Sequence, residues 1–195
     1  SNIVFMGMGE PLMNYDAVLG SVSKITSDAG LGMGNKRITI STVGLAARIK
    51  SLADDGVKCN LAISLHAPTE AQRSSIMPVN RKRKTDLSAL KDAVQYYHAN
   101  TGLPVTYEYC MFSGFNDSEK DATELANIVY WAPSKVNLIM FNPVDDTDFA
   151  RTSEERLNRF IRVLVKRKVR VTVRRSRGQD IDAACGQLAT KQKAG

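Results

Sequence analysis

Six short apolar segments recur along this sequence, each followed by glycine or polar residues and then by a helical pattern. The segments are rich in β-branched and aromatic residues, which is typical of strands, and they span 3–6, 37–42, 60–66, 105–112, 136–141 and 169–175. Between them apolar residues recur at helical spacing, most clearly over 86–101. One strand and one helix in each unit of roughly thirty residues predicts an α/β fold with a mostly parallel sheet.

The number of units predicts how far such a sheet closes. Right-handed crossovers curl it toward a barrel, and a complete eight-stranded barrel takes about 250 residues. This chain has 195 residues. We therefore expect an incomplete (β/α) barrel of about six strands over residues 1–189, followed by a polar tail at 190–195.

The first segment, IVFM at 3–6, is continuously apolar, so we expect a strand buried on both faces. It breaks into GMGEP at 7–11, where glycines allow a backbone to approach a ligand and Glu10 supplies acceptors for an amine or hydroxyl. A plain glycine-rich turn fits the same spacing. Further along, we expect Asp117 to cap the helix that runs to about Tyr130.

Polar side chains follow the apolar part of every predicted strand. In a parallel barrel the carboxyl ends of the strands share one mouth, where the active sites of such folds lie. The sequence therefore predicts one pocket at the mouth, formed from Gly9 and Glu10, Ser41 and Thr42, Ser64 to His66, Ser113 to Asn116, Asn142, and Arg175 with Ser176.

The charge of the chain suggests a phosphate-bearing partner. Most of the net charge of +7 lies in two stretches, 81–84 and 166–177, although a solvated basic face on an ordinary enzyme is the alternative. No apolar stretch is long enough to span a bilayer and no signal-peptide pattern is present, so the expected location is the cytoplasm.

The three cysteines lack the spacing of a metal site or a disulfide framework, and no metal ligands are predicted in this chain. Cys59 and Cys110 are expected to be small core residues. Cys185 lies close to several arginines, which would favour its thiolate form, so it could be a nucleophile or a buried thiol. His66 could be a functional or a structural imidazole, and His98 is expected at the surface.

Five motifs resemble the RlmN-type radical S-adenosylmethionine (SAM) RNA methyltransferases, over essentially the whole chain and in the same order: GMGEPL at 7–12, ISTVG at 40–44, AISLHAP at 62–68, FNP at 141–143 and RRSRGQDIDAACGQL at 174–188. The resemblance implies methylation of adenine carbon 2 in 23S ribosomal RNA and some transfer RNAs by a radical mechanism. It also implies a [4Fe–4S] cluster, an external electron donor and a monomeric full-length enzyme.

The same resemblance implies roles for individual residues. Cys185 would carry the methyl group as S-methylcysteine, and Glu10 with Gly9 would hold the methionine amine of SAM. The remaining implied contacts are Ser41 to the polar groups of SAM, Ser64, Leu65 and His66 to its ribose and carboxylate side, and Asn142 to its adenosine end. Independently, we expect Arg174, Arg175 and Arg177, together with residues 81–84, to contact RNA phosphate.

One feature of the family is missing from this sequence. Radical SAM enzymes hold their cluster on a CxxxCxxC loop after the first strand, and the chain contains no such loop. We therefore expect a fragment that lacks the first strand and the cluster loop and that is inactive alone. Open alternatives are a Cfr-type enzyme that methylates carbon 8, a non-catalytic RNA-binding barrel and a phosphate-binding barrel enzyme.

Overall fold

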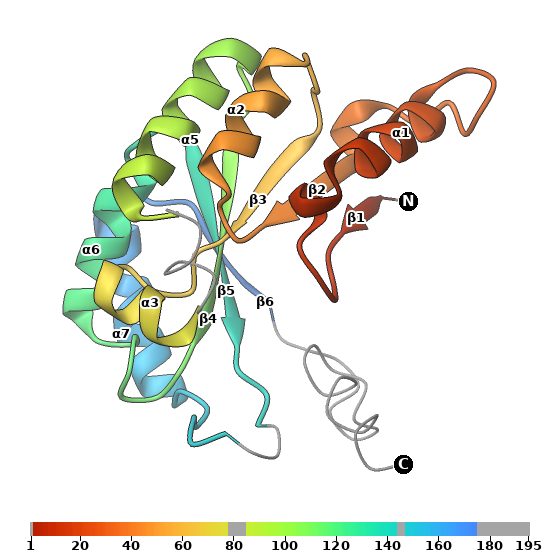
Figure 1. Cartoon of the computed structure of the whole chain (residues 1–195). Helices are drawn as coiled ribbons and strands as arrows, with labels where there is room; N and C mark the ends of the chain where they lie inside the picture. Colours follow the sequence, from red (N-terminus) through yellow and green to blue (C-terminus); the bar gives the residue numbers. More distant parts are fainter. Residues whose placement is uncertain (1, 78–84, 144–146, 175–195) are drawn as a thin grey trace, which may run out of the picture.

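The computed structural model describes residues 2–77, 85–143 and 147–174. Its six strands form one sheet in chain order, and every neighbouring pair is parallel (Figure 1). The predicted strand count and orientation are thereby confirmed. The strands are β1 (Ile3–Phe5), β2 (Ile38–Thr42), β3 (Asn60–Ser64), β4 (Val105–Met111), β5 (Ser134–Met140) and β6 (Val171–Arg174).

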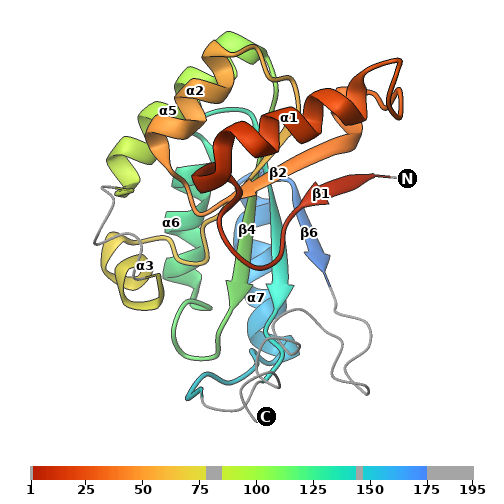
Figure 2. The same cartoon turned by 45° about the vertical axis from the view of Figure 1, so that its right-hand side comes forward.

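The helices connect consecutive strands and cover one face of the sheet (Figures 1 and 2). They are η1 (Pro11–Asn14), α1 (Tyr15–Thr26), η2 (Asn35–Arg37), α2 (Ala46–Asp54), α3 (Glu70–Ile76), α5 (Leu87–Thr101), α6 (Glu119–Val129) and α7 (Glu154–Lys166). Asp86 caps the start of α5, where its carboxylate accepts from the N–H of Ala89, and Gly102, in the left-handed region, caps its end.

The sheet curls so that its two outer strands approach each other. At the end of β6, Nη1 of Arg174 lies 3.8 Å from Sδ of Met6, which follows β1. The described strands therefore enclose a lumen on the side opposite the helices, as expected for an incomplete (β/α) barrel. The predicted tail at 190–195 lies outside the described residues.

Side chains alternate between the two faces of the sheet. Tyr107 and Tyr109 of β4 are fully buried on the helical side, and the ring of Tyr109 lies 5.6 Å from that of Phe160 in α7. The intervening Glu108 stands in register with Ser64 of β3 and Asn137 of β5. Because aligned residues of parallel strands share a face, the lumen is lined by polar side chains.

Two local predictions are wrong. Strand β1 is not buried on both faces: Val4 is 55% exposed, because among the described strands β1 pairs only with β2 and its inner face opens on the lumen. Ser118, not Asp117, caps α6, in a reciprocal capping box with Asp121. The Asp117 carboxylate instead pairs with the guanidinium of Arg156 at 2.5 Å.

The exposed edge of β1 predicts self-association. Among the described strands β1 pairs only with β2, and an apolar strand with one free edge is a template for another strand. We expect the mass from light scattering to rise with protein concentration, and Val4→Lys to suppress the rise. A constant monomer mass, together with fast amide exchange at Val4 to Met6, would show that the edge is solvated.

Candidate functional site

The motif resemblance implies seven residues that contact SAM, and five of them line one cavity. This mouth cavity has a volume of about 270 Å³ and lies at the carboxyl ends of β1, β2 and β3. Strand ends far apart in the sequence meet here because the sheet is parallel and in chain order. Its lining includes Gly9, Glu10, Ser41, Ser64 and His66.

Two predicted residues lie outside this lining. The side chain of Leu65 is fully buried in the core, and that of Asn142, which follows β5, is 4% exposed. In the described part of the chain, the residues at the ends of β1 to β3 therefore line one cavity, and Asn142 is not among its lining residues.

The carboxylate of Glu10 fastens the loop after β1 to the end of β2. Oε1 accepts from the N–H of Leu12 at 2.9 Å, and Oε2 accepts from the N–H of Val43 at 2.7 Å. A carboxylate has about four lone-pair sites, so Glu10 can still accept from a ligand amine. Gly9 has φ +86°, a conformation that side-chain-bearing residues rarely adopt.

His66 is held in a constrained turn at the end of β3. Its φ is +57°, its Nδ1 accepts from the N–H of Cys110 at 3.1 Å, and its carbonyl accepts from Nδ2 of Asn116 at 2.6 Å. Burial, with a smaller contribution from the nearby Arg73, lowers the pKa of His66 to about 4. The imidazole is therefore neutral at physiological pH, and Nδ1 acts as an acceptor.

Arg73 holds together backbone segments next to the mouth cavity. It was not identified from the sequence. It is fully buried, and its guanidinium donates to three backbone carbonyls: Leu65 at 3.2 Å, Thr85 at 3.1 Å and Val43 at 3.0 Å. Val43 itself lines the mouth cavity, and Leu65 lies between the lining residues Ser64 and His66. Burial lowers the pKa of Arg73 to about 10, so it remains charged. No local pattern in AQRSSI singled it out.

Glu108 is a second residue that sequence reasoning missed. It is 5% exposed and lines a larger cavity of about 1100 Å³ inside the lumen. Its Oε1 accepts from Nδ2 of Asn137 at 2.8 Å, whereas Oε2 has no hydrogen-bond partner among the described residues. Desolvation raises the pKa of Glu108, although Asn137 and two nearby cations oppose the rise. A lone carboxylate in an aromatic strand was the available signal.

The described residues do not fit an iron–sulfur cluster. Cys59 precedes β3 and is buried as predicted, whereas Cys110, in β4, is only partly buried and is not the core residue that the sequence predicts. Within the described ranges, no group of three His, Cys, Asp or Glu side chains could hold a metal ion. Three thiolates on one loop are therefore not supplied here. Cys185, Arg175, Arg177 and residues 81–84 lie outside the described residues.

His98 is partly exposed near the end of α5, and its Nδ1 lies 2.9 Å from the carbonyl oxygen of Leu103.

The chain belongs to the Radical SAM superfamily, whose sequence profile matches residues 1–126. It is 63% identical over 191 residues to a protein of Salinibacter ruber named "Probable dual-specificity RNA methyltransferase RlmN", which covers 98% of this chain and 52% of that protein. A protein of the same name from Christiangramia forsetii is 51% identical, covering 98% of this chain and 54% of that protein. The chain thus spans about half the length of these curated relatives.

A solved structure supports the same relationship. The crystal structure of a radical SAM methyltransferase from Sphaerobacter thermophilus superposes with a TM-score of 0.89 at 45% identity, and covers 95% of this chain and 54% of that one. The resemblance expected from the motifs is therefore confirmed. Among the described helices, none is long and apolar enough to cross a membrane.

Proposed function

We propose that this chain supplies the SAM-binding part of a radical SAM RNA methyltransferase. The observation that carries the proposal is the mouth cavity, where residues of three separate motifs line one space. The chain's superfamily and the names of its relatives agree with this reading. The proposed substrates are 23S ribosomal RNA and transfer RNA, methylated at carbon 2 of an adenine. The full-length enzyme is proposed to act in the cytoplasm as a monomer.

Within this proposal each residue has a role that its surroundings permit. Glu10 and Gly9 hold the methionine amine, Ser41 meets the polar groups of SAM, and Ser64 and His66 line the ribose and carboxylate side. Leu65, with its side chain in the core, shapes the turn. Asn142 meets the adenosine end.

The remaining parts of the chemistry involve groups outside the described residues. SAM, with a cluster and an external electron donor, supplies the methyl group and the radical. Cys185 carries the methyl group. Arg175 and Arg177 contact RNA phosphate together with Arg174, which is the last residue of β6 and lies within the described part of the chain. Because the described cysteines do not fit a cluster, we expect the chain alone to be inactive.

Calorimetric titration with SAM tests the proposal. We expect SAM to bind the chain, and Glu10→Gln to weaken binding about tenfold or more, since a hydrogen bond to a charged group contributes about 1.5–3 kcal/mol. Ser41→Ala should weaken binding without disturbing the Glu10 loop. The matched control is Glu119→Gln, because the side chain of Glu119 is exposed at the start of α6. Absence of SAM binding, or equal affinity in all variants, would contradict the assignment.

A chimaera addresses the position of methylation. This chain would replace the matching 191 residues of the Salinibacter ruber relative, and the nucleosides of the RNA product would be separated by chromatography and mass spectrometry. The proposal predicts 2-methyladenosine. The alternative, a Cfr-type enzyme, predicts 8-methyladenosine.

A further inference from the structure

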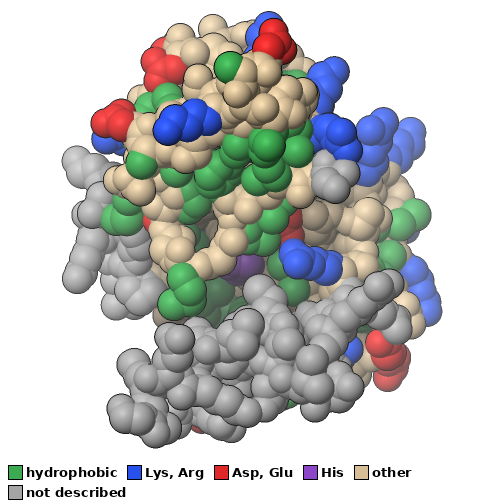
Figure 3. All heavy atoms as spheres, turned by 90° about the vertical axis from the view of Figure 1, so that its right-hand side faces the viewer, with side chains coloured by type: hydrophobic (Ala, Val, Ile, Leu, Met, Phe, Trp, Pro, Cys, Tyr) green, Lys and Arg blue, Asp and Glu red, His purple; other side chains and the backbone are tan. Residues whose placement is uncertain are grey.

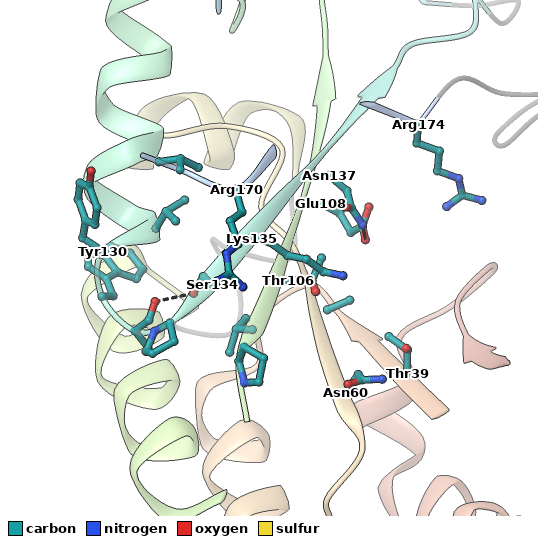
Figure 4. A pocket seen from close by; sticks show the side chains of 18 of the residues that line it. Thr39, Asn60, Thr106, Glu108, Tyr130, Ser134, Lys135, Asn137, Arg170 and Arg174 are labelled. Atoms are coloured by element: carbon teal, nitrogen blue, oxygen red, sulfur yellow. Dashed lines mark hydrogen bonds between the residues drawn. The ribbon is translucent and has the colours of Figure 1, made fainter. Parts of the chain in front are cut away.

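The large lumen cavity adjoins the mouth cavity at Met6, which lines both, but none of the residues proposed to bind SAM lines it. It has a volume of about 1100 Å³, and its walls come from all six strands and from the turns that precede β5 and β6 (Figure 4). The amino-terminal halves of the strands contribute Thr39, Asn60 and Thr106. The cavity therefore lies toward the amino ends of the strands, whereas the mouth cavity lies at the carboxyl ends.

Positive charge dominates this cavity. Four cationic side chains line it against a single carboxylate, Glu108; the four are Lys135, Lys168, Arg170 and Arg174. None of the four forms an ion pair with another described residue. Figure 4 shows Lys135 and Arg170 pointing into the same space, with Arg174 on its other side. Lys and Arg side chains also gather along one margin of the open side of the molecule (Figure 3).

Like charges that share a hollow repel each other unless an anion lies between them. All four cationic side chains are solvent-exposed, so water and salt screen part of their repulsion, and it is their summed field that attracts an anion. A concave site strengthens the field that draws an anion in. The arrangement therefore favours an anionic ligand over water alone.

Other lining groups narrow the class of anion. Trp131 and the exposed Tyr130 lie in the turn before β5 and line the same cavity, and aromatic rings stack on nucleobases. Oε2 of Glu108, which has no hydrogen-bond partner in the described ranges, can accept a hydrogen bond from a hydroxyl or an amino group. A nucleotide carries all three matching features: a phosphate, a base, and hydroxyl or amino donors.

We propose that the lumen cavity binds a nucleotide phosphate, with Lys135 and Arg170 contacting the phosphate and Trp131 stacking on the base. The phosphate belongs either to a free nucleotide or to a single-stranded RNA segment. This site goes beyond the proposed SAM chemistry, because none of the residues proposed to bind SAM lines it.

Trp131 reports on this site directly, because it is the only tryptophan of the chain. Its fluorescence would be measured during titration with a ten-nucleotide single-stranded RNA, with adenosine monophosphate and with inorganic phosphate. We expect saturable quenching by the RNA or the mononucleotide, and competition by inorganic phosphate. The double variant Lys135→Gln/Arg170→Gln should weaken binding at least tenfold. For the RNA, its salt slope should fall by about 1.4 units, at roughly 0.7 per lost contact.

The matched control is Lys91→Gln/Arg162→Gln, which removes two exposed charges on α5 and α7 outside the cavity. Tighter binding of the RNA than of the mononucleotide would identify RNA as the source of the phosphate, and the reverse would identify a free nucleotide. Unchanged Trp131 fluorescence with all three probes, or equal losses in both double variants, would overturn the proposal. Calorimetric titration of the same two double variants with SAM measures binding at the mouth cavity, so failure of the SAM proposal can be told apart from failure of this one.

Discussion

Replacing Arg73 with methionine is expected to lower the free energy of unfolding by roughly 3–5 kcal/mol. The substitution retains most of the side-chain volume but removes every donor, so the carbonyls of Val43, Leu65 and Thr85 lose the hydrogen bonds that the buried guanidinium makes. Typical domains have a total stability of about 5–15 kcal/mol. The loss would therefore be a large fraction of the total, and urea unfolding followed by circular dichroism would measure it.

Arg73→Lys distinguishes charge from geometry in the same experiment. A lysine ammonium is a compact donor that cannot reproduce the planar fork of a guanidinium, so we expect an intermediate loss of stability. This variant should also weaken SAM binding, because Val43 is held by Arg73 through its carbonyl and donates its N–H to Glu10. Arg162→Ala, on the exposed face of α7, should change stability by less than about 0.5 kcal/mol. Equal stability of wild type and Arg73→Met would refute the supporting role.

The strand pattern and the clustering at the mouth could be predicted because both follow from local periodicity. Apolar runs near Ile3, Ile38 and Val105 identify strands, and parallel order then brings Glu10 and Ser41 to one end of the sheet. These steps need no knowledge of which side chains touch. The polar lumen could not be predicted in the same way, since it depends on the register of each strand with its neighbours.

The missed residues depend on contacts between distant segments. Arginine is almost never fully buried unless it is paired, and Arg73 is buried only because carbonyls from three other segments surround it. Whether Asp117 or Ser118 caps α6 also depends on a contact with a distant segment. Both side chains are good caps, and the ion pair with Arg156, 39 residues away, engages the first and leaves the second to cap.

The last prediction concerns the response of stability to pH. His66 has a pKa of about 4 in the folded protein, against about 6.5 for an unperturbed imidazole. The unfolded chain therefore binds the proton more tightly, so the contribution of neutral His66 is fully present above about pH 6.5 and is lost as the pH falls toward 4. The loss at pH 4.5 should be about 2–3 kcal/mol. Its main cause is burial of the imidazole, with a smaller contribution from Arg73, and a proton on Nδ1 would also face the N–H of Cys110.

His66→Asn isolates this contribution from those of the carboxylates that titrate over the same range. Asparagine tolerates the left-handed conformation that His66 adopts at φ +57°, and its Oδ1 offers an acceptor in place of Nδ1 without gaining a proton. Urea unfolding at pH 7.5 and 4.5 should show a smaller decrease in stability for this variant than for wild type, by about 2–3 kcal/mol. Equal decreases in the two proteins would mean that the neutral imidazole does not couple folding to pH.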